Sequence, residues 1–118
     1  MIRKSSDRHI EKRLAMRGGK GTVLVEHLFL QNEIRAKCRL CSVLKLEPLS
    51  SIGLHKHEGE DELFLVLRGS AVLIDEKGTK TFLSEGDAVL TGNGEAHSLV
   101  NENSQNVAEV LAVIMQYQ

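Results

Sequence analysis

Residues 53–69 read GLHKHEGEDELFLVLRG, and this stretch indicates both the fold and a site. His55 and His57 are two residues apart, so on an extended strand both imidazoles leave the same face. Glu62 follows after four residues that include Gly59, which is enough chain for a tight turn and a return strand. Its carboxylate would then lie beside two imidazoles, which are good ligands for a divalent transition metal. The stretch therefore predicts two neighbouring strands that carry metal ligands.

A second stretch supplies a fourth candidate ligand. Residues 86–101 read GDAVLTGNGEAHSLVN, in which a strand, a glycine turn and another strand follow one another. His97 stands just after the turn. We therefore expect His97 to join His55, His57 and Glu62 around one divalent metal ion.

The two stretches together resemble the two motifs of the cupin family. The first family motif is H-x-H, four residues, E, six residues, G, and the second is G, five residues, P-x-G, two residues, H, three residues, N. The residues that match them are His55, His57, Glu62, Gly69, Gly86, Gly94, His97 and Asn101. Gly92 stands where the family usually has proline, so we expect a looser turn before His97. The resemblance implies an all-β fold, a double-stranded β-helix or small jelly-roll barrel.

Strand-length segments separated by turn residues support this fold class independently. The expected strands are residues 22–30, 37–47, 51–57, 62–67, 70–75, 80–83, 88–91, 97–101 and 106–115. About nine short strands at even spacing predict a closed antiparallel sandwich or barrel. Residues 1–21 are polar and basic, and we interpret them as an N-terminal arm, either a short helix or extended, ahead of a single cupin-like domain at 22–118. The glycines of residues 17–21 fit a loop into the barrel better than a phosphate cradle, because a strand follows them and not a helix.

Alternation along the strands predicts which side chains face the barrel interior. If the histidines are ligands, Glu62, Phe64 and Val66 face inward, and the leucines between them form an outward face that is wholly apolar. Residues 111–115 are apolar on both faces. Such faces need a cover, so we expect a homodimer, with the N-terminal arm as the alternative cover.

The chemistry of the four ligands is typical of a metal with open positions. Three imidazoles and one carboxylate do not fill an octahedral ion, as a catalytic rather than structural metal requires. The residue types do not decide among manganese, iron, nickel and zinc. The resemblance implies oxygenases, decarboxylases, isomerases or binding modules. We expect a metal-dependent enzyme acting on a small organic acid or sugar-like compound, with a non-catalytic small-molecule binding or sensing module as the alternative.

Several polar residues besides the four ligands could lie near the site, and the sequence suggests a role for each. His27 and Glu26 are the only ionisable residues expected near the pocket besides the ligands, and His27 is the candidate acid or base, with an ordinary strand histidine as the alternative reading. Glu58, Glu60 and Asp61 rival Glu62 in spacing, but we expect them to form a solvated acidic turn. Asn101 is expected to bond backbone at a strand end and not to bind metal.

Composition argues against several classes of partner. The chain has 15 Lys and Arg against 16 Asp and Glu, 3% aromatic residues and no Trp, which leaves little material for nucleic-acid binding. No apolar run approaches 18 residues and no hydrophobic stretch follows the charged N-terminus, so we expect a cytoplasmic protein without a membrane span. Cys38 and Cys41 would diverge on a strand, so we expect free thiols in a reducing compartment.

Overall fold

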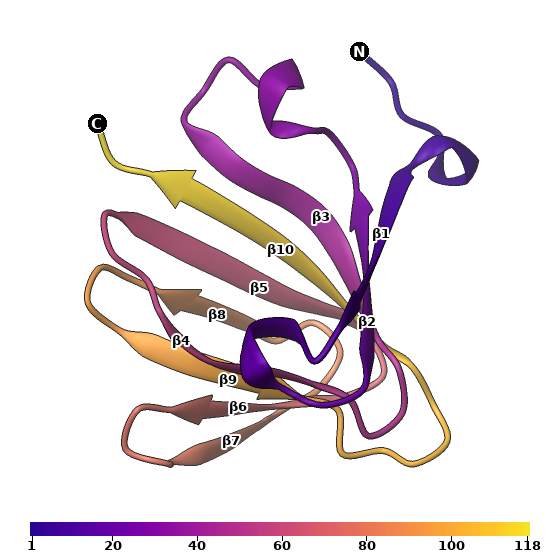
Figure 1. Cartoon of the computed structure of the whole chain (residues 1–118), viewed down its shortest axis with the longest axis vertical. Helices are drawn as coiled ribbons and strands as arrows, with labels where there is room; N and C mark the ends of the chain where they lie inside the picture. Colours follow the sequence, from indigo (N-terminus) through magenta and orange to yellow (C-terminus); the bar gives the residue numbers. More distant parts are fainter.

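A computed structural model describes all residues, 1–118, and its framework is two antiparallel sheets (Figure 1). The larger sheet has six strands in the order β1-β2-β3-β10-β5-β8, and the smaller has four in the order β4-β9-β6-β7. The only helices are three single 3-10 turns, and none has the length and apolar character needed to cross a membrane. The expectation of an all-β jelly roll is confirmed.

The strand bounds agree closely with the segments read from the sequence. The strands are β1 His9–Leu14, β2 Thr22–His27, β3 Cys38–Leu46, β4 Ser51–Lys56, β5 Glu60–Arg68, β6 Ala71–Asp75, β7 Lys80–Leu83, β8 Ala88–Thr91, β9 Ala96–Val100 and β10 Ala108–Gln116. The 3-10 turns are η1 Ser5–Asp7, η2 Met16–Gly18 and η3 Gln31–Glu33. Nine of the ten strands were expected, and β1 is the exception.

The N-terminal segment is extended, one of the two forms that the sequence left open. Strand β1 pairs with β2 from His9 opposite His27 to Leu14 opposite Thr22, which makes it the edge strand of the larger sheet. The sequence does not predict this strand, because its apolar residues do not form a buried face. Ile10 and Leu14 are 53% and 70% exposed. The segment therefore contributes a strand to the framework, followed directly by η2 beside β4.

The core lies between the two sheets and is built mainly of aliphatic side chains. Its largest fully buried members are Phe64, Leu44, Leu46, Ile52 and Leu99. On β5 the alternation is as expected, because Glu62, Phe64 and Val66 are buried while Leu67 is 45% exposed. Glu62 lies two residues before Phe64 on β5, so its side chain is on the same face of the strand and also points into the interior.

The outer face of the larger sheet is apolar over two adjacent strands. Leu63 and Leu65 on β5 lie opposite Val113 and Leu111 on β10, so the two apolar stretches seen in the sequence form one continuous patch. Strand β1 lies at one edge of this sheet, three strands from β10 and four from β5 in the sheet order. The N-terminal segment that could have covered the patch is thus paired elsewhere.

Candidate metal centre

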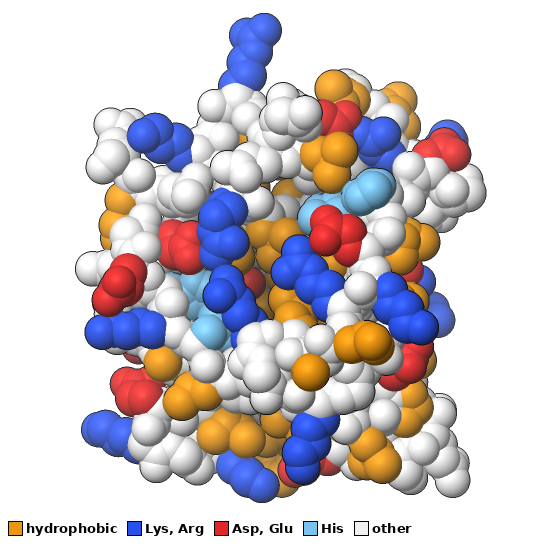
Figure 2. All heavy atoms as spheres, in the orientation of Figure 1, with side chains coloured by type: hydrophobic (Ala, Val, Ile, Leu, Met, Phe, Trp, Pro, Cys, Tyr) orange, Lys and Arg blue, Asp and Glu red, His pale blue; other side chains and the backbone are white.

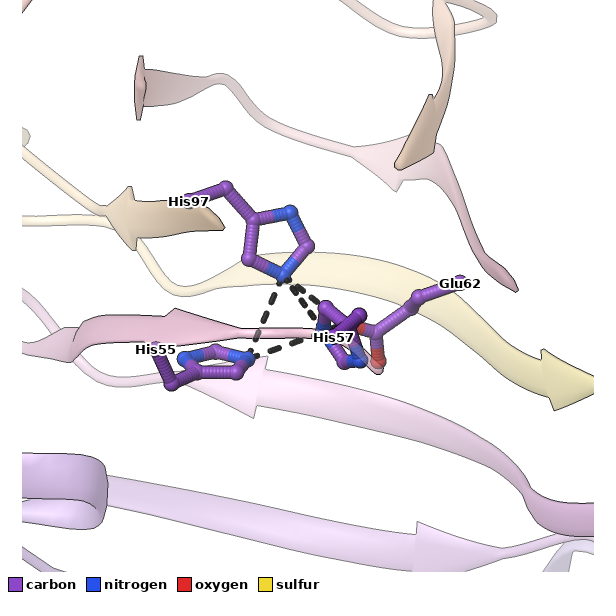
Figure 3. A group of neighbouring side chains, drawn as sticks. All are labelled: His55, His57, Glu62 and His97. Atoms are coloured by element: carbon purple, nitrogen blue, oxygen red, sulfur yellow. Dashed lines mark hydrogen bonds and ion pairs between the residues drawn. The ribbon is translucent and has the colours of Figure 1, made fainter. Parts of the chain in front are cut away.

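Three strands or strand ends bring the four expected ligands together (Figure 3). His55 is on β4, His57 follows that strand directly, Glu62 is on β5 and His97 is on β9. Because β4 pairs with β9, His55 and His97 are opposite each other in register. Each of the four residues offers one ligand atom, and these four atoms lie within 4.8 Å of one another. The four side chains therefore form a group that could hold a metal ion.

The spacing of these atoms suits a metal ion. His97 Nε2 is 3.1 Å from His57 Nε2, 3.2 Å from His55 Nε2 and 2.9 Å from Glu62 Oε1. His57 Nε2 is also 2.9 Å from Glu62 Oε1, and only the separation of 3.9 Å between His55 Nε2 and that oxygen is longer. Metal–nitrogen and metal–oxygen bonds are about 2.0–2.2 Å, so ligand atoms at right angles lie about 3 Å apart. The residues present therefore fit a divalent ion.

The outward ring nitrogens explain why all three Nε2 atoms point to the centre. His55 Nδ1 donates to the Gly53 carbonyl at 2.8 Å, and His57 Nδ1 donates to the Glu60 carboxylate at 3.0 Å. His97 Nδ1 pairs with the Thr91 hydroxyl at 2.7 Å. A ring that donates through Nδ1 carries its lone pair on Nε2 when neutral. When the rings are neutral with their hydrogen on Nδ1, lone pairs and a carboxylate converge in a buried space, an arrangement that a cation stabilises. A proton on an Nε2 atom can take the place of that cation by hydrogen-bonding to Glu62.

The electrostatics of the centre follow from this crowding. Burial alone would raise the pKa of Glu62, but hydrogen bonds with the three histidines outweigh it and hold the pKa well below its ordinary value. The hydrogen bond to Glu62 raises the pKa of His57 against the effect of burial, and Glu60 adds to the rise. Burial lowers the pKa of His97. The carboxylate is therefore ionised, and a metal must compete with a proton mainly at His57.

Glu60 corrects the expectation of a solvated acidic turn. It is only 8% exposed, and its carboxylate lies between His57 and Arg39, whose guanidinium donates to both of its oxygens at 3.0 and 2.9 Å. The bond with Arg39 lowers the pKa of Glu60, so it is an ionised acceptor for His57. A signal was present in the sequence, because Glu60 and Glu62 share one strand face. Of the three acidic residues expected in the turn, only Glu58 is exposed, and Asp61 is half-buried.

The turn before His97 is tied down without proline. The Gly92 N–H donates to the Glu95 carboxylate at 2.8 Å, and the Gly94 N–H donates to the His57 carbonyl at 2.7 Å. The first bond closes the turn on itself, and the second joins the turn to His57, the ligand that follows β4. Asn101 behaves as expected, since its buried amide donates to the carbonyls of Leu46 and Asn106 at 3.0 and 2.9 Å.

A cavity of about 280 Å³ opens beside the centre and is lined by His55, His57 and Glu62 among others. Three arginines also line it: Arg13, Arg17 and Arg39. Figure 2 shows a hollow with a hydrophobic floor, with Lys and Arg side chains at its border. The volume equals about nine water molecules at roughly 30 Å³ each, so the space suits a small molecule.

His27 lines this cavity, whereas Glu26 does not. The His27 Nε2 atom is 2.6 Å from the Glu11 carboxylate of β1, and this bond lowers the pKa of Glu11. Glu26 is paired instead with Lys45 at 2.8 Å and Arg8 at 3.3 Å, which corrects its expected place near the pocket. The reason is geometric, because adjacent strand residues point to opposite faces.

The N-terminal segment supplies cavity residues that the sequence did not reveal. Arg13, Met16 and Arg17 all line the cavity. The sequence does not show where the basic residues of this polar N-terminal segment lie in the fold, because their position depends on the pairing of β1 with β2. With that pairing, the face of β1 that holds Glu11 and Arg13 lies beside Val25 and Val23, which are buried in the core.

Comparisons with known proteins agree with this architecture. Residues 42–114 match the family model described as "Cupin domain". A protein of Thermotoga maritima named "Oxalate-binding protein" is 42% identical over 115 residues, covering 98% of this chain and 93% of that protein.

Solved structures give the same picture. A crystal structure described as a predicted oxalate decarboxylase of Thermotoga maritima is 41% identical with a TM-score of 0.91, covering 98% of this chain and 99% of that one. An RmlC-like cupin of Shewanella frigidimarina is 10% identical with a TM-score of 0.77, covering 99% and 91% of the two chains. The second likeness shows the fold alone.

Proposed function

This chain belongs to the cupin domain family, and from that premise we propose that it is a metal-dependent enzyme acting on a small organic acid. Oxalate is the first substrate to test, because a Thermotoga maritima relative 42% identical to this chain is named for oxalate binding. A Thermotoga maritima crystal structure 41% identical to this chain is described as a predicted oxalate decarboxylase. Sugar-like compounds are less favoured, since the cavity is lined by three arginines and has only one aromatic side chain, Phe64, on its wall.

The observation that carries the proposal is the convergence of four metal ligands beside a small arginine-lined cavity. His55, His57, Glu62 and His97 would hold manganese, iron, nickel or zinc. A bound ion of this kind supplies Lewis acidity and open positions for an oxygen ligand such as a carboxylate. The arginines of the lining, of which Arg17 has no carboxylate partner, favour an anionic ligand over a neutral one.

We assign the proton-handling role to His27. Its Nε2 atom is paired with the Glu11 carboxylate at 2.6 Å, and an ionised acceptor there requires Nε2 to carry the hydrogen. The neutral ring then has Nδ1 free to accept a proton from a ligand in the cavity and to return it. Glu11 acts through His27 by fixing the orientation and tautomer of the ring.

A non-catalytic binding module remains the second candidate function. It is favoured by the name of the Thermotoga maritima oxalate-binding protein, which refers to binding and not to a reaction. In that case the same metal centre would anchor an acid without converting it. The two candidates differ in one measurable property, which is turnover.

The test is to load the protein with Mn²⁺, Fe²⁺, Ni²⁺ or Zn²⁺ and to supply oxalate and a panel of other small acids. We expect conversion of an acid, measured by NMR of the products together with oxygen uptake, and for oxalate the products of decarboxylation would be formate and carbon dioxide. Binding of an acid without turnover under any of these metals would favour the binding module.

We predict that Glu62→Gln separates the two functions further. The substitution keeps the shape of the side chain but removes its negative charge, so the charge on the bound metal is less well compensated. Turnover should change by about 10-fold or more, and the metal content measured by elemental analysis should change less. A binding module would instead show altered acid affinity in this variant and no turnover in either form.

We also propose that the functional unit is a homodimer. The patch of Leu63, Leu65, Leu111 and Val113 extends toward Leu90, which is 61% exposed on β8 and pairs with Leu63. A second copy packed face to face would bury this patch, and a two-fold contact is the commonest way to do so.

A further inference from the structure

Arg17 differs from the other two arginines that line the cavity, because it has no carboxylate partner. Arg13 is paired with Glu11 at 3.2 Å, and Arg39 is paired with Glu60 at 2.9 Å. No ion pair or side-chain hydrogen bond is formed by Arg17, although it lines the same cavity. Arg17 is exposed, and of the three arginines that line the cavity it alone has no carboxylate partner.

The backbone around Arg17 adopts a conformation that most residues avoid. Ala15 and Arg17 have φ values of 49° and 54°, in the left-handed region, and neither is glycine or asparagine. Such residues cost of order 1–3 kcal/mol and cluster at ligand-binding positions. The fold therefore retains a strained turn where its side chains, Met16 and Arg17, line the cavity.

Two glycines lock this turn against the strand that carries a metal ligand. A Cβ atom on Gly53 would lie 2.1 Å from the Arg17 carbonyl oxygen, and a Cβ atom on Gly19 would lie 2.1 Å from the Ser51 carbonyl oxygen. The backbones of η2 and β4 are thus in direct contact (Figure 1, the indigo turn beside β4). The Gly53 carbonyl also accepts the hydrogen bond of His55 Nδ1. One residue therefore joins the Arg17 turn to the metal centre.

We propose that Arg17 is the specificity residue of the site and binds the carboxylate of a short dicarboxylic acid that does not bind the metal. The inference rests on the proposed function, since it requires the other carboxylate of the acid to lie at the metal centre. A guanidinium has planar paired donors that match a carboxylate, and an unpaired one retains all of them for a ligand. Backbone contact between η2 and β4 holds the turn that carries Arg17 beside the strand that carries His55.

A phosphate cradle formed by residues 17–21 explains the structure less well. Strand β2 begins at Thr22, so no helix N-terminus follows the glycines. Lys20 does not line the cavity, and its backbone N–H is already bonded to the Ser51 hydroxyl at 2.9 Å. Of the two basic residues in this segment, only Arg17 is placed to meet a cavity ligand.

The experiment is calorimetry on manganese-loaded protein with oxalate and malonate as dicarboxylates and glycolate and acetate as single carboxylates. Arg17→Gln should weaken binding of the dicarboxylates by about 10- to 100-fold, as expected for loss of a charge-assisted hydrogen bond, and leave the single carboxylates within about twofold. Arg17→Lys should give a smaller loss, because it keeps the charge but not the paired donors. Lys20→Gln is the matched control and should change neither.

The outcomes separate this inference from the proposed function. Equal dicarboxylate affinity in wild type and Arg17→Gln overturns the role of Arg17 and leaves the proposed function intact. If manganese-loaded wild type binds none of the four acids, the inference is overturned, and the proposed function is still decided by turnover with the four metals and the wider panel of acids. If Arg17→Gln also loses manganese because the turn has moved, Arg17→Lys decides: retained manganese with weaker dicarboxylate binding supports the inference, and unchanged dicarboxylate binding overturns it.

Discussion

The residues of the metal centre are oriented by a second set of residues that do not bind the metal. Gly53, Glu60 and Thr91 each bond the outward nitrogen of one histidine. The most elaborate of these supports is at His57, where Arg39 holds Glu60 and Glu60 holds the ring. Partners of this kind fix the tautomer and orientation of a ligand, so their removal should weaken metal binding without removing a ligand.

We predict a graded loss of metal affinity at this position. Glu60→Gln should weaken Mn²⁺ or Zn²⁺ binding by about 10- to 100-fold, because it removes the ionised acceptor that orients His57. His57→Ala should cause a larger loss, since it removes a ligand. Calorimetry on purified, metal-free protein measures both, and His9→Ala is the control because His9 is outside the ligand group. Full metal binding by His57→Ala would show that the ligand assignment is wrong.

Strands β1 and β2 place residues at the cavity whose positions the sequence did not predict. Their inner face supplies Arg13 and His27 to the cavity, and the His27 ring is paired with Glu11 of β1. On β2 itself, Glu26 is buried between Lys45 of β3 and Arg8, the residue before β1. Burial alone would raise the pKa of Glu26, but the bonds from Lys45 and Arg8 outweigh it and lower the pKa. This ion pair therefore joins the edge of the sheet to its interior.

The lowered pKa of Glu26 predicts a specific dependence of stability on pH. A carboxyl whose folded pKa is below its unfolded value of about 4.5 stabilises the fold above that pH, and the contribution is lost as pH falls through the folded pKa. Glu26→Gln should reduce stability at pH 7 by about 1.5–3 kcal/mol and flatten the decrease in melting temperature from pH 5 to pH 3. Thermal melts of metal-free protein measure this effect.

The control for this prediction is Glu102→Gln. Glu102 is more exposed and its contact with Lys80 is longer, at 3.6 Å, so its removal should have little effect. If Glu26→Gln and wild type lose melting temperature in parallel below pH 5, the Glu26 pair does not contribute to acid sensitivity.

At the scale of the whole molecule, two sheets enclose the site and leave one apolar outer face. Leu65 and Leu111 are opposite each other near the middle of that face. Each large apolar side chain left exposed forgoes about 1.5–3 kcal/mol of burial, so a partner surface is favoured. The single chain offers no element for this purpose, because β1 is paired at the far edge.

We predict that the protein is a dimer of about 26 kDa, twice the chain mass of 13.1 kDa. Leu65→Arg should shift it to a monomer, because a charge in the patch would be buried by dimerisation. Phe82→Arg is the control, since Phe82 is 75% exposed on the smaller sheet. Light scattering at micromolar concentration measures the mass. A monomeric wild type would contradict the prediction, as would a Leu65→Arg variant that remains folded and dimeric.

Local patterns in the sequence predicted nine of the ten strands and the four candidate ligands. Alternation places His55 and His57 on one face and Glu62 with Phe64 on another, and these are local consequences of the two-residue period of a strand. Glycine and turn residues mark most strand ends for the same local reason. Which strands lie side by side became known only from the folded chain. It paired β1 with β2, which brought Glu11 to His27, and it packed η2 on β4, which brought Arg17 to the cavity. It also showed Glu60 to be buried by Arg39, a residue 21 positions away. Pairings of this kind depend on register and packing between distant segments, and no periodicity within one segment encodes them.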